Sequence, residues 1–437
     1  MTTDYNNDGH LPIHEAAFRN FDMLIDRIID SIISKDVSNE EIVLSDEEKE
    51  RAYKNNLDRI QELLESVTYD YFRLTPLLAA TVGDARDAID CLIRHGAKVT
   101  CRDGDNRSMA AITILKQNVG LFLYLNQASY ANELDLWNTL MTMFSSKLIE
   151  ESVAAGRLLE QLTSPLYAET AWPYLAPLRL IEKTIQVFIH AVQNNLQETL
   201  IISCLLIFYN LFSIEPNIRS LFAKSVEPTR NLIKMRKNNE TVSFLFAHIV
   251  CHLCDSVDCI RIFVDQNVIG EIQILLVMDT EQVPQTQICK YFEILGKIAR
   301  CEKHYQTLIQ NASAAKIPVL DRSIHLLECS DRYLTIAILH FIRDLCLQNE
   351  EQQRICALNH ELIKRLLEIL DSSYRDVQRA SVDTLQVKQE NSSFTHLIKH
   401  KDEILFQITS DDRDSKYNFS IDHHTTRRRR TTLEFIE

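Results

Sequence analysis

Glycine and proline are scarce in this sequence, with only 8 Gly and 9 Pro among 437 residues. Large α/β enzymes need many tight turns and phosphate-binding loops, and both features depend on glycine. The scarcity therefore argues against a large α/β enzyme and favours helices joined by short corners. The sequence also contains no nucleophile elbow, Gly-rich phosphate loop or HExxH motif, so we expect no enzymatic activity and no cofactor.

A surplus of basic residues is missing as well. The net charge is −14, whereas nucleic-acid-binding domains normally carry a positive surplus, so the body of the chain is not expected to bind nucleic acid. The most apolar run, Leu200 to Phe208, is too short to span a bilayer, which takes about 20 residues, and we expect no membrane association.

The 11 Cys lack the spacing of a disulfide framework, and the first residues lack the apolar segment of a secretory signal. We therefore expect reduced thiols in a cytoplasmic protein, which is also nuclear if an import signal is present.

Short repeats occupy the first third of the sequence. Residues 9–17 (GHLPIHEAA) and 74–80 (LTPLLAA) each place a proline at the start of a helix and an alanine pair one turn later. Gly96 stands where glycine can end a second helix with a positive φ. A third copy, residues 103–111, follows the second by 33 positions, from 76 to 109. This pattern and period predict about three ankyrin repeats over residues 8–127.

Residues 34–66 interrupt that period. They contain a charged stretch at 45–51, which we interpret as a solvated loop, and an amphipathic segment, LDRIQELL, at 57–64. We interpret the interval as a decayed unit with a charged loop; an insertion is the alternative.

A longer repeat follows. Similar segments begin at positions 217, 259, 304 and 352, and intervals in the forties are typical of armadillo and HEAT repeats. The clearest unit, 349–380, predicts a short first helix, an apolar second helix and a third helix after a polar corner. We predict about five armadillo-like repeats over residues 132–408, with proline-containing interruptions, and a flexible polar tail at 409–437. The predicted fold is an all-α repeat solenoid: N-terminal ankyrin repeats followed by an armadillo-like superhelix.

Ankyrin units that lead directly into armadillo units are an unusual order, and the segment DLWNTL at 135–140 lies at the junction. On these features the sequence resembles the ankyrin and armadillo repeat-containing protein family over most of residues 8–408. It is short for that family, as if fewer armadillo units were retained. The resemblance implies a protein-interaction role and supplies no catalytic residues.

Peptide-binding armadillo proteins carry an Asn near the end of each third helix, and these amides grip the backbone of an extended peptide. In this sequence, alignment of the helix ends puts six residues there: Gln161, Asn210, His252, Lys297, Asp344 and Gln386. Only one is Asn, so we do not expect capture of a long extended peptide. Either a mixed polar groove binds a folded partner or an internal segment, or these positions are simply solvated. Arg219, Arg261 and Lys297 are further candidates on this side.

Ankyrin units usually bind partners through loop tips and first-helix faces. This makes five residues candidates for partner binding: Asp8, His10, Arg73, Asp103 and Asp105. His14, at the start of the first helix, is expected to hydrogen-bond neighbouring turns and to serve the structure alone.

Cys251, His252 and Cys254, with His248 and Cys259 nearby, suggest zinc at first sight. No second ligand pair follows at matched spacing and the segment reads as an apolar helix, so we expect no metal. A thiol enzyme using Cys251, or alternatively Cys346, with a distant histidine is a remote alternative.

The sequence predicts a non-catalytic protein–protein interaction scaffold or adaptor whose partners are other proteins. A structural component of cytoskeletal or ciliary assemblies is the alternative. The run Arg427 to Arg430 is a nuclear-import signal, a target of basophilic kinases, or a solvated tail in loose intramolecular contact with the acidic body.

Overall fold

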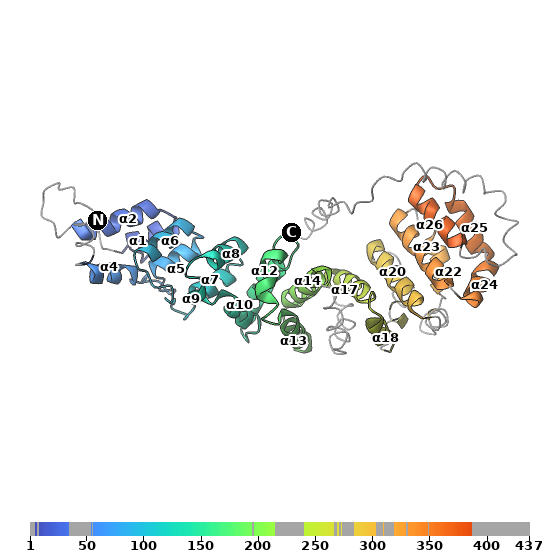
Figure 1. Cartoon of the computed structure of the whole chain (residues 1–437), viewed down its shortest axis with the longest axis horizontal. Coiled ribbons are helices and arrows are strands. Elements are labelled where there is room, and N and C mark those ends of the chain that lie inside the picture. Colours follow the sequence, from blue (N-terminus) through green and yellow to red (C-terminus); the bar gives the residue numbers. More distant parts are fainter. Residues whose placement is uncertain are drawn as a thin grey trace. The chain divides into compact units, whose positions relative to one another are not determined.

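The computed structural model describes residues 5–6, 8–34, 54, 56–194, 196–214, 240–265, 269–270, 272, 284–302, 309, 319–328, 331–347 and 349–386. Within these residues the regular structure is helical, with one isolated antiparallel bridge between Arg102 and Ser108 and no strand (Figure 1). The prediction of an all-α fold is confirmed for this part of the chain. None of the helices described combines the length and the apolarity needed to cross a membrane.

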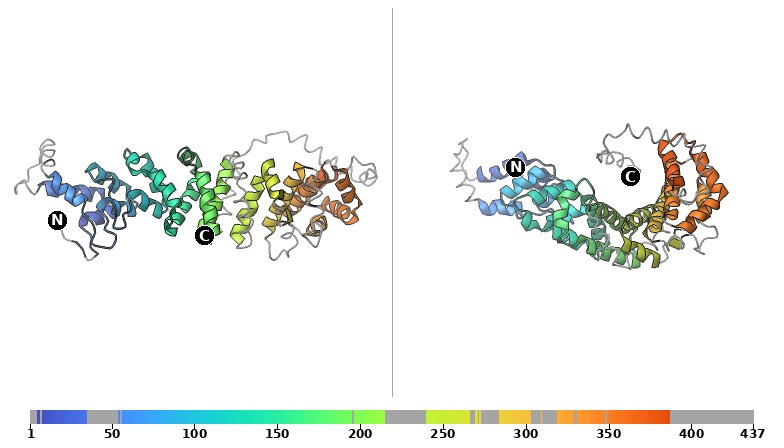
Figure 2. Two further views of the ribbon diagram at one scale, coloured as in Figure 1. Left: turned by 90° about the horizontal axis from the view of Figure 1, so that it is seen from below. Right: turned by 45° about the vertical axis from the view of Figure 1, so that its right-hand side comes forward.

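The chain divides into two compact units, Met1–Ile262 (unit 1) and Phe263–Glu437 (unit 2), and α18 (Val257–Asp265) contains the division. The other helices of unit 1 are α1 (Pro12–Phe18), α2 (Asp22–Ser34), α4 (Leu57–Leu64), α5 (Pro76–Val82), α6 (Arg86–Arg94), α7 (Met109–Leu115), α8 (Val119–Gln127), α9 (Ala131–Leu134), α10 (Leu136–Phe144), α11 (Ile149–Leu162), α12 (Ala168–Leu175), α13 (Leu180–Gln193), α14 (Glu198–Ile214) and α17 (Glu240–Leu253). Those of unit 2 are α20 (Gln285–Cys301), α22 (Val319–Leu326), α23 (Arg332–Cys346), α24 (Glu350–Leu358), α25 (His360–Ile369) and α26 (Arg375–Gln386). The order within each unit can be followed by colour in Figure 2.

Paired short helices recur at the start of unit 1. The pair α5–α6 is followed by α7–α8 with the same helix lengths. Thr75 and Ser108 cap the first helices, because their hydroxyls accept the amide hydrogens of Leu78 and Ala111 at 3.3 and 3.2 Å. Such a cap satisfies an amide that the helix itself leaves without an acceptor. The local sequence therefore fixes where each pair begins.

The turn inside each pair passes through a residue with positive φ: Asn20, Asp84 and Gln117, at 59°, 52° and 54°. Neighbouring turns are joined by side chains. The Asn20 carboxamide oxygen accepts the Ala88 amide at 3.0 Å, and Asn118 Nδ2 donates to Asp84 at 2.8 Å. First helices pack on one another in the order α1, α5, α7 and α10. Each helix pair therefore packs on the next with first helix against first helix.

His14 is fully buried at the start of α1. Its Nδ1 accepts the Leu11 amide at 3.2 Å, and its Nε2 lies 3.2 Å from the Ser66 carbonyl oxygen, 52 positions away. Burial lowers the pKa of His14 to about 4, so the ring is neutral in the folded chain. This hydrogen bonding is the structural role that the sequence predicted for His14.

Trp137, in the junction segment, holds three helices together. Its ring stacks on Tyr174 of α12 at 4.9 Å and meets Phe122 of α8 edge-on at 4.9 Å. Its Nε1 donates to Asn126 Oδ1 at 2.6 Å. Through Trp137, α10 is fastened to the helix pair before it and to α12 after it.

Longer helices follow in both units. In unit 1, α11, α14 and α17 pack successively, and in unit 2, α20, α23 and α26 do the same. The helices α24, α25 and α26 correspond to the short first helix, the apolar second helix and the third helix after a polar corner that the sequence predicted, and the armadillo-like repeat is confirmed there. The first of the predicted proline-containing interruptions, residues 163–177, contains α12, with Pro173 inside the helix. The amphipathic segment at 57–64 is α4.

Three sequence predictions lie outside the described residues: the charged loop at 45–51, the candidate Arg219, and the tail at 409–437 with Arg427–Arg430.

Candidate functional site

Three loops of unit 1 lie side by side and form what we call the loop-tip surface, residues 8–10, 69–73 and 103–107. The Tyr69 amide donates to the Gly9 carbonyl oxygen at 2.9 Å, and the Gly104 amide donates to the Phe72 carbonyl oxygen at 2.7 Å. A Cβ at Gly104 would stand 2.7 Å from the Tyr71 carbonyl oxygen, so only glycine permits this approach. The loops therefore hold one another in place by backbone contacts.

Aromatic side chains stand exposed on this surface. Tyr69, Tyr71 and Phe72 are 76%, 77% and 51% exposed. The rings of Tyr71 and Phe72 meet edge-on at 5.6 Å, and the Tyr71 hydroxyl donates to Asp105 at 3.1 Å. Clustered exposed aromatics on a rigid frame are typical of surfaces that bind other proteins.

All five residues predicted for this side lie on these loops. Asp8 and Arg73 are exposed, and Arg73 adopts a positive φ of 48°. Asp103 shapes its own loop, because it accepts the backbone amides of Asp105 and Arg107 at 3.0 and 2.7 Å. Asp105 also pairs with the Arg107 guanidinium at 3.0 Å. Asp8 and Arg73 are therefore the predicted residues best placed to meet a partner.

The remaining predicted residue, His10, lies between two carboxylates, 3.3 Å from Glu15 and 3.6 Å from Asp70. Burial opposes ionisation of Asp70, but hydrogen bonds from Thr68, the Arg73 amide and His10 outweigh it and hold the pKa of Asp70 below its usual value. This local network ties His10 to the turn that carries the aromatics.

The sequence reasoning missed Tyr69, Tyr71 and Phe72. The signal was available in the segment YDYF at 69–72, because three aromatics just before a helix cap cannot all enter the core of a tight turn.

The six predicted groove residues lie near the ends of α11, α14, α17, α20, α23 and α26, one in each helix. In unit 1, Gln161 is exposed, whereas Asn210 is engaged: its Nδ2 donates to the Glu160 carbonyl oxygen at 3.1 Å and lies 3.3 Å from Thr163 Oγ1. Asn210, the one asparagine among the six predicted groove residues, thus joins α14 to α11.

Beside Asn210 runs a row of half-buried rings, Tyr209 on α14 and Phe244, His248 and His252 on α17. Tyr209 meets His248 at 5.9 Å and His252 at 5.7 Å, both edge-on, and Phe244 lies 4.4 Å from His248. We call these four residues the aromatic row. His252, predicted as a groove residue, belongs to it.

In unit 2, Asp344 is almost fully buried, at 3% exposure. Its carboxylate pairs with Arg300 of α20 at 3.1 Å and with Arg343 at 3.0 Å. Burial raises the pKa of Asp344 although both arginines act in the opposite direction. Asp344 therefore joins α20 to α23 and presents two cations to solvent. Lys297 is half-buried nearby on α20, and Gln386 is the last residue of α26.

The cysteines considered for zinc or catalysis are core residues. Cys251, Cys254, Cys259 and Cys346 are 7%, 3%, 1% and 1% exposed. In the described part of the chain, none of these four thiols belongs to a group of three possible metal ligands that lie within 4.8 Å of one another. Arg261 is exposed on α18 and lies 4.0 Å from Asp258.

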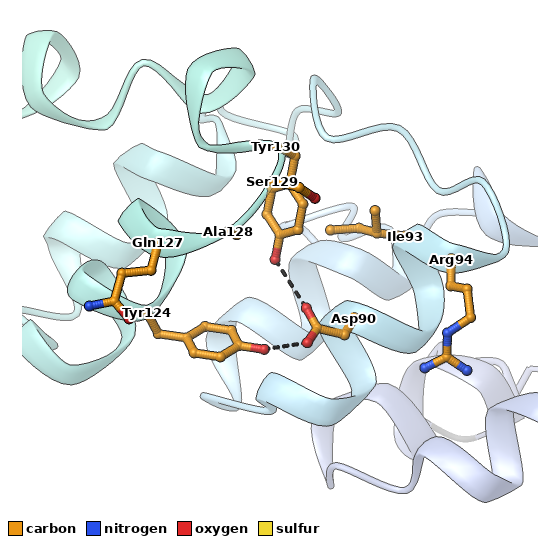
Figure 3. Close-up of a pocket in the computed structure, with 8 residues that line it drawn as sticks. All are labelled: Asp90, Ile93, Arg94, Tyr124, Gln127, Ala128, Ser129 and Tyr130. Atoms are coloured by element: carbon orange, nitrogen blue, oxygen red, sulfur yellow. Dashed lines mark hydrogen bonds between the residues drawn. The ribbon is translucent and has the colours of Figure 1, made fainter.

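A cavity of about 410 Å³ lies where α6 meets α8 (Figure 3). Tyr124 and Tyr130 point at Asp90 from two sides, and their hydroxyls donate to its two oxygens at 2.5 and 3.3 Å. Burial and the neighbouring Asp90 raise the pKa of Tyr124 to about 12. Asp90 lies on α6 and accepts a hydrogen bond from Tyr124 on α8, so it links consecutive helix pairs.

No family model and no curated protein matches this chain. Among solved structures, an engineered protein from the Northeast Structural Genomics Consortium is 12% identical, with a TM-score of 0.54 over 87% of this chain and 99% of that one. A designed armadillo repeat protein in complex with a (KR)4 peptide is 14% identical, with a TM-score of 0.47 over 58% of this chain and 99% of its own. The first likeness shows a shared helical fold and leaves function to be argued from the residues.

Proposed function

We propose that this chain is a non-catalytic protein-binding scaffold with two separate docking surfaces, one on ankyrin-type repeats at residues 8–127 and one on armadillo-type repeats at 132–408. The ankyrin assignment is supported by helix pairs that recur after 33 positions, from 76 to 109, by the Thr75 and Ser108 caps, and by the buried His14. Linking two such surfaces raises the effective concentration of one partner near another.

The exposed aromatics of the loop-tip surface carry this proposal. Clusters of exposed apolar side chains, unlike single scattered ones, mark surfaces that bind other molecules. Tyr71 and Phe72 contribute no core packing that would explain them, and backbone contacts hold their loop rigid before any partner arrives. A rigid aromatic anchor loses little conformational entropy on binding.

On the second surface, the aromatic row and the exposed Gln161 of unit 1 are the proposed contacts. Asn210 and Asp344 make contacts between helices of this chain and do not offer a series of side-chain amides to a peptide backbone. We therefore propose a folded partner and not an extended peptide.

The test uses the intact chain, because α7 packs against α10 and α11 and a cut after residue 127 would expose core. Tyr71→Ser with Phe72→Ser disables the loop-tip surface, and Gln161→Arg alters the armadillo side. Tyr333→Ser, at a tyrosine that is 70% exposed in unit 2, is the matched control. Proteins bound to each tagged variant are identified by crosslinking and mass spectrometry.

We expect the double variant to lose one set of partners, with affinities falling about 30-fold or more, while the second set remains. Gln161→Arg should weaken the second set alone, and the control should keep both. Retention of every partner by the double variant would refute docking at the loop tips. If the unmodified chain sediments as large self-assemblies without partners, the structural alternative replaces the scaffold.

A further inference from the structure

Three potential metal ligands converge between α2 and α6. Asp26 is on α2, Cys91 is in the last turn of α6, and His95 caps its end. Asp26 Oδ1 lies 2.8 Å from His95 Nε2 and 3.2 Å from Cys91 Sγ. All three ligand atoms lie within 4.8 Å of one another, and among the described residues no other group of three His, Cys, Asp or Glu does so.

The helix geometry explains this convergence. Cys91 and His95 are four positions apart, so they project from one face of α6. That face packs on α2, which places Asp26 opposite both. The same carboxylate oxygen of Asp26 is hydrogen-bonded to both the thiol and the imidazole.

The next interface provides a direct comparison. There Asp90 stands at the position of α6 that corresponds to Asp26 of α2, and Tyr124 of α8 corresponds to Cys91. At that interface, the groups that donate hydrogen bonds to Asp90 are the hydroxyls of Tyr124 and Tyr130. At the α2–α6 interface, the donors are instead a thiol and an imidazole, two of the side chains that bind zinc best.

The donor set selects the metal by chemistry. Thiolate and imidazole disfavour Mg²⁺ and Ca²⁺, which require oxygen ligands, and suit Zn²⁺. Tetrahedral zinc holds its ligand atoms about 3.5 Å apart, and the carboxylate oxygen of Asp26 lies 2.8 Å from the imidazole and 3.2 Å from the thiol, which is close to that spacing. The side chains of His95 and Asp26 are 19% and 42% exposed, which leaves solvent a path to a fourth position.

We propose that Asp26, Cys91 and His95 form a zinc-binding site that ties α2 to α6, with water as the fourth ligand. Binding requires Cys91 to lose its thiol proton to solvent. The bound ion then replaces two hydrogen bonds between neighbouring helix pairs by three metal–ligand bonds. This site is independent of the proposed docking surfaces, and its role is to stabilise the start of unit 1.

The experiment loads the full chain, after removal of metals with a chelator, with Co²⁺ as a spectroscopic probe and then with Zn²⁺. We expect one tightly bound Co²⁺ with intense tetrahedral d–d bands and a thiolate-to-metal charge-transfer band, both abolished by competing Zn²⁺. Cys91→Ser should remove the charge-transfer band, and Asp26→Asn and His95→Gln should each weaken binding by about 100-fold.

Cys101→Ser is the matched control, because Cys101 is a half-buried thiol of the same region, 3.4 Å from Thr75 Oγ1 and outside the cluster. Its spectrum should equal that of the unmodified chain. Circular dichroism checks folding, and Asp26→Asn alters a partly exposed side chain, so it tests the site even if Cys91→Ser unfolds. No bound Co²⁺, Co²⁺ without a thiolate band, or a band that survives in a folded Cys91→Ser chain would overturn the proposal.

Discussion

Replacing Trp137 by alanine tests whether the junction of unit 1 is held as the structure indicates. The substitution removes the stack on Tyr174, the edge contact with Phe122 and the hydrogen bond to Asn126. These contacts join α8, α10 and α12. We therefore expect a local loss of stability centred on these three helices.

The magnitude follows from the contacts. Trp137 is partly buried, so about 100 Å² of apolar area at about 25 cal/mol per Å² contributes about 2.5 kcal/mol. Loss of the hydrogen bond adds about 1 kcal/mol. The sum, about 3.5 kcal/mol, corresponds to a change of about 300-fold in the local opening equilibrium, since 1.4 kcal/mol is about tenfold.

Hydrogen exchange read by mass spectrometry suits a chain of two units, because it reports each helix separately and does not require two-state unfolding. Amides of α8, α10 and α12 should exchange about 300-fold faster in Trp137→Ala, with α23 in unit 2 unchanged. Trp137→Phe, which keeps an aromatic ring and loses the hydrogen bond worth about 1 kcal/mol, should exchange about fivefold faster. Unchanged exchange in all three helices, or equal acceleration of α23, would refute the reasoning.

Four further substitutions test single positions in the two units. His14→Gln should remove a pH dependence of about 2–3 kcal/mol in the free energy of unfolding. In the folded chain the pKa of His14 is lowered to about 4, so the stability is fully present above about pH 6.5 and is lost as the pH falls toward 4. Urea unfolding at several pH values measures this dependence. Gly83→Ala places a Cβ 2.1 Å from the Phe18 carbonyl oxygen and should cost at least about 2 kcal/mol by the same assay. Gly96→Ala meets only Gln61 Oε1, at an ordinary contact distance of 3.9 Å, and should cost about 1 kcal/mol because its φ is 96°. Asp344→Ala removes the carboxylate that joins α20 to α23 and should lower the stability of unit 2 by about 1 kcal/mol in thermal unfolding, because the arginines left behind are 48% and 27% exposed and can be solvated.

The helices and their period were available from the sequence. Thr75 followed by Pro76 marks a helix start through a contact that spans only three positions, and the same holds for Ser108. The helices α24 to α26 follow from apolar spacing alone. Signals of this kind are local, since each depends on neighbours within one or two helical turns.

Contacts between distant segments decided the sites. Asp26 meets Cys91 and His95 across 65 and 69 positions, and nothing near any of the three residues announces the other two. Asn210, a groove residue by its position in the helix, became a helix-to-helix contact because Glu160 and Thr163 lie opposite it. The sequence by itself determined where helices begin and how often they recur; the lateral register of one helix against the next, set by packing over the whole unit, decided which side chains meet and which remain free for a partner.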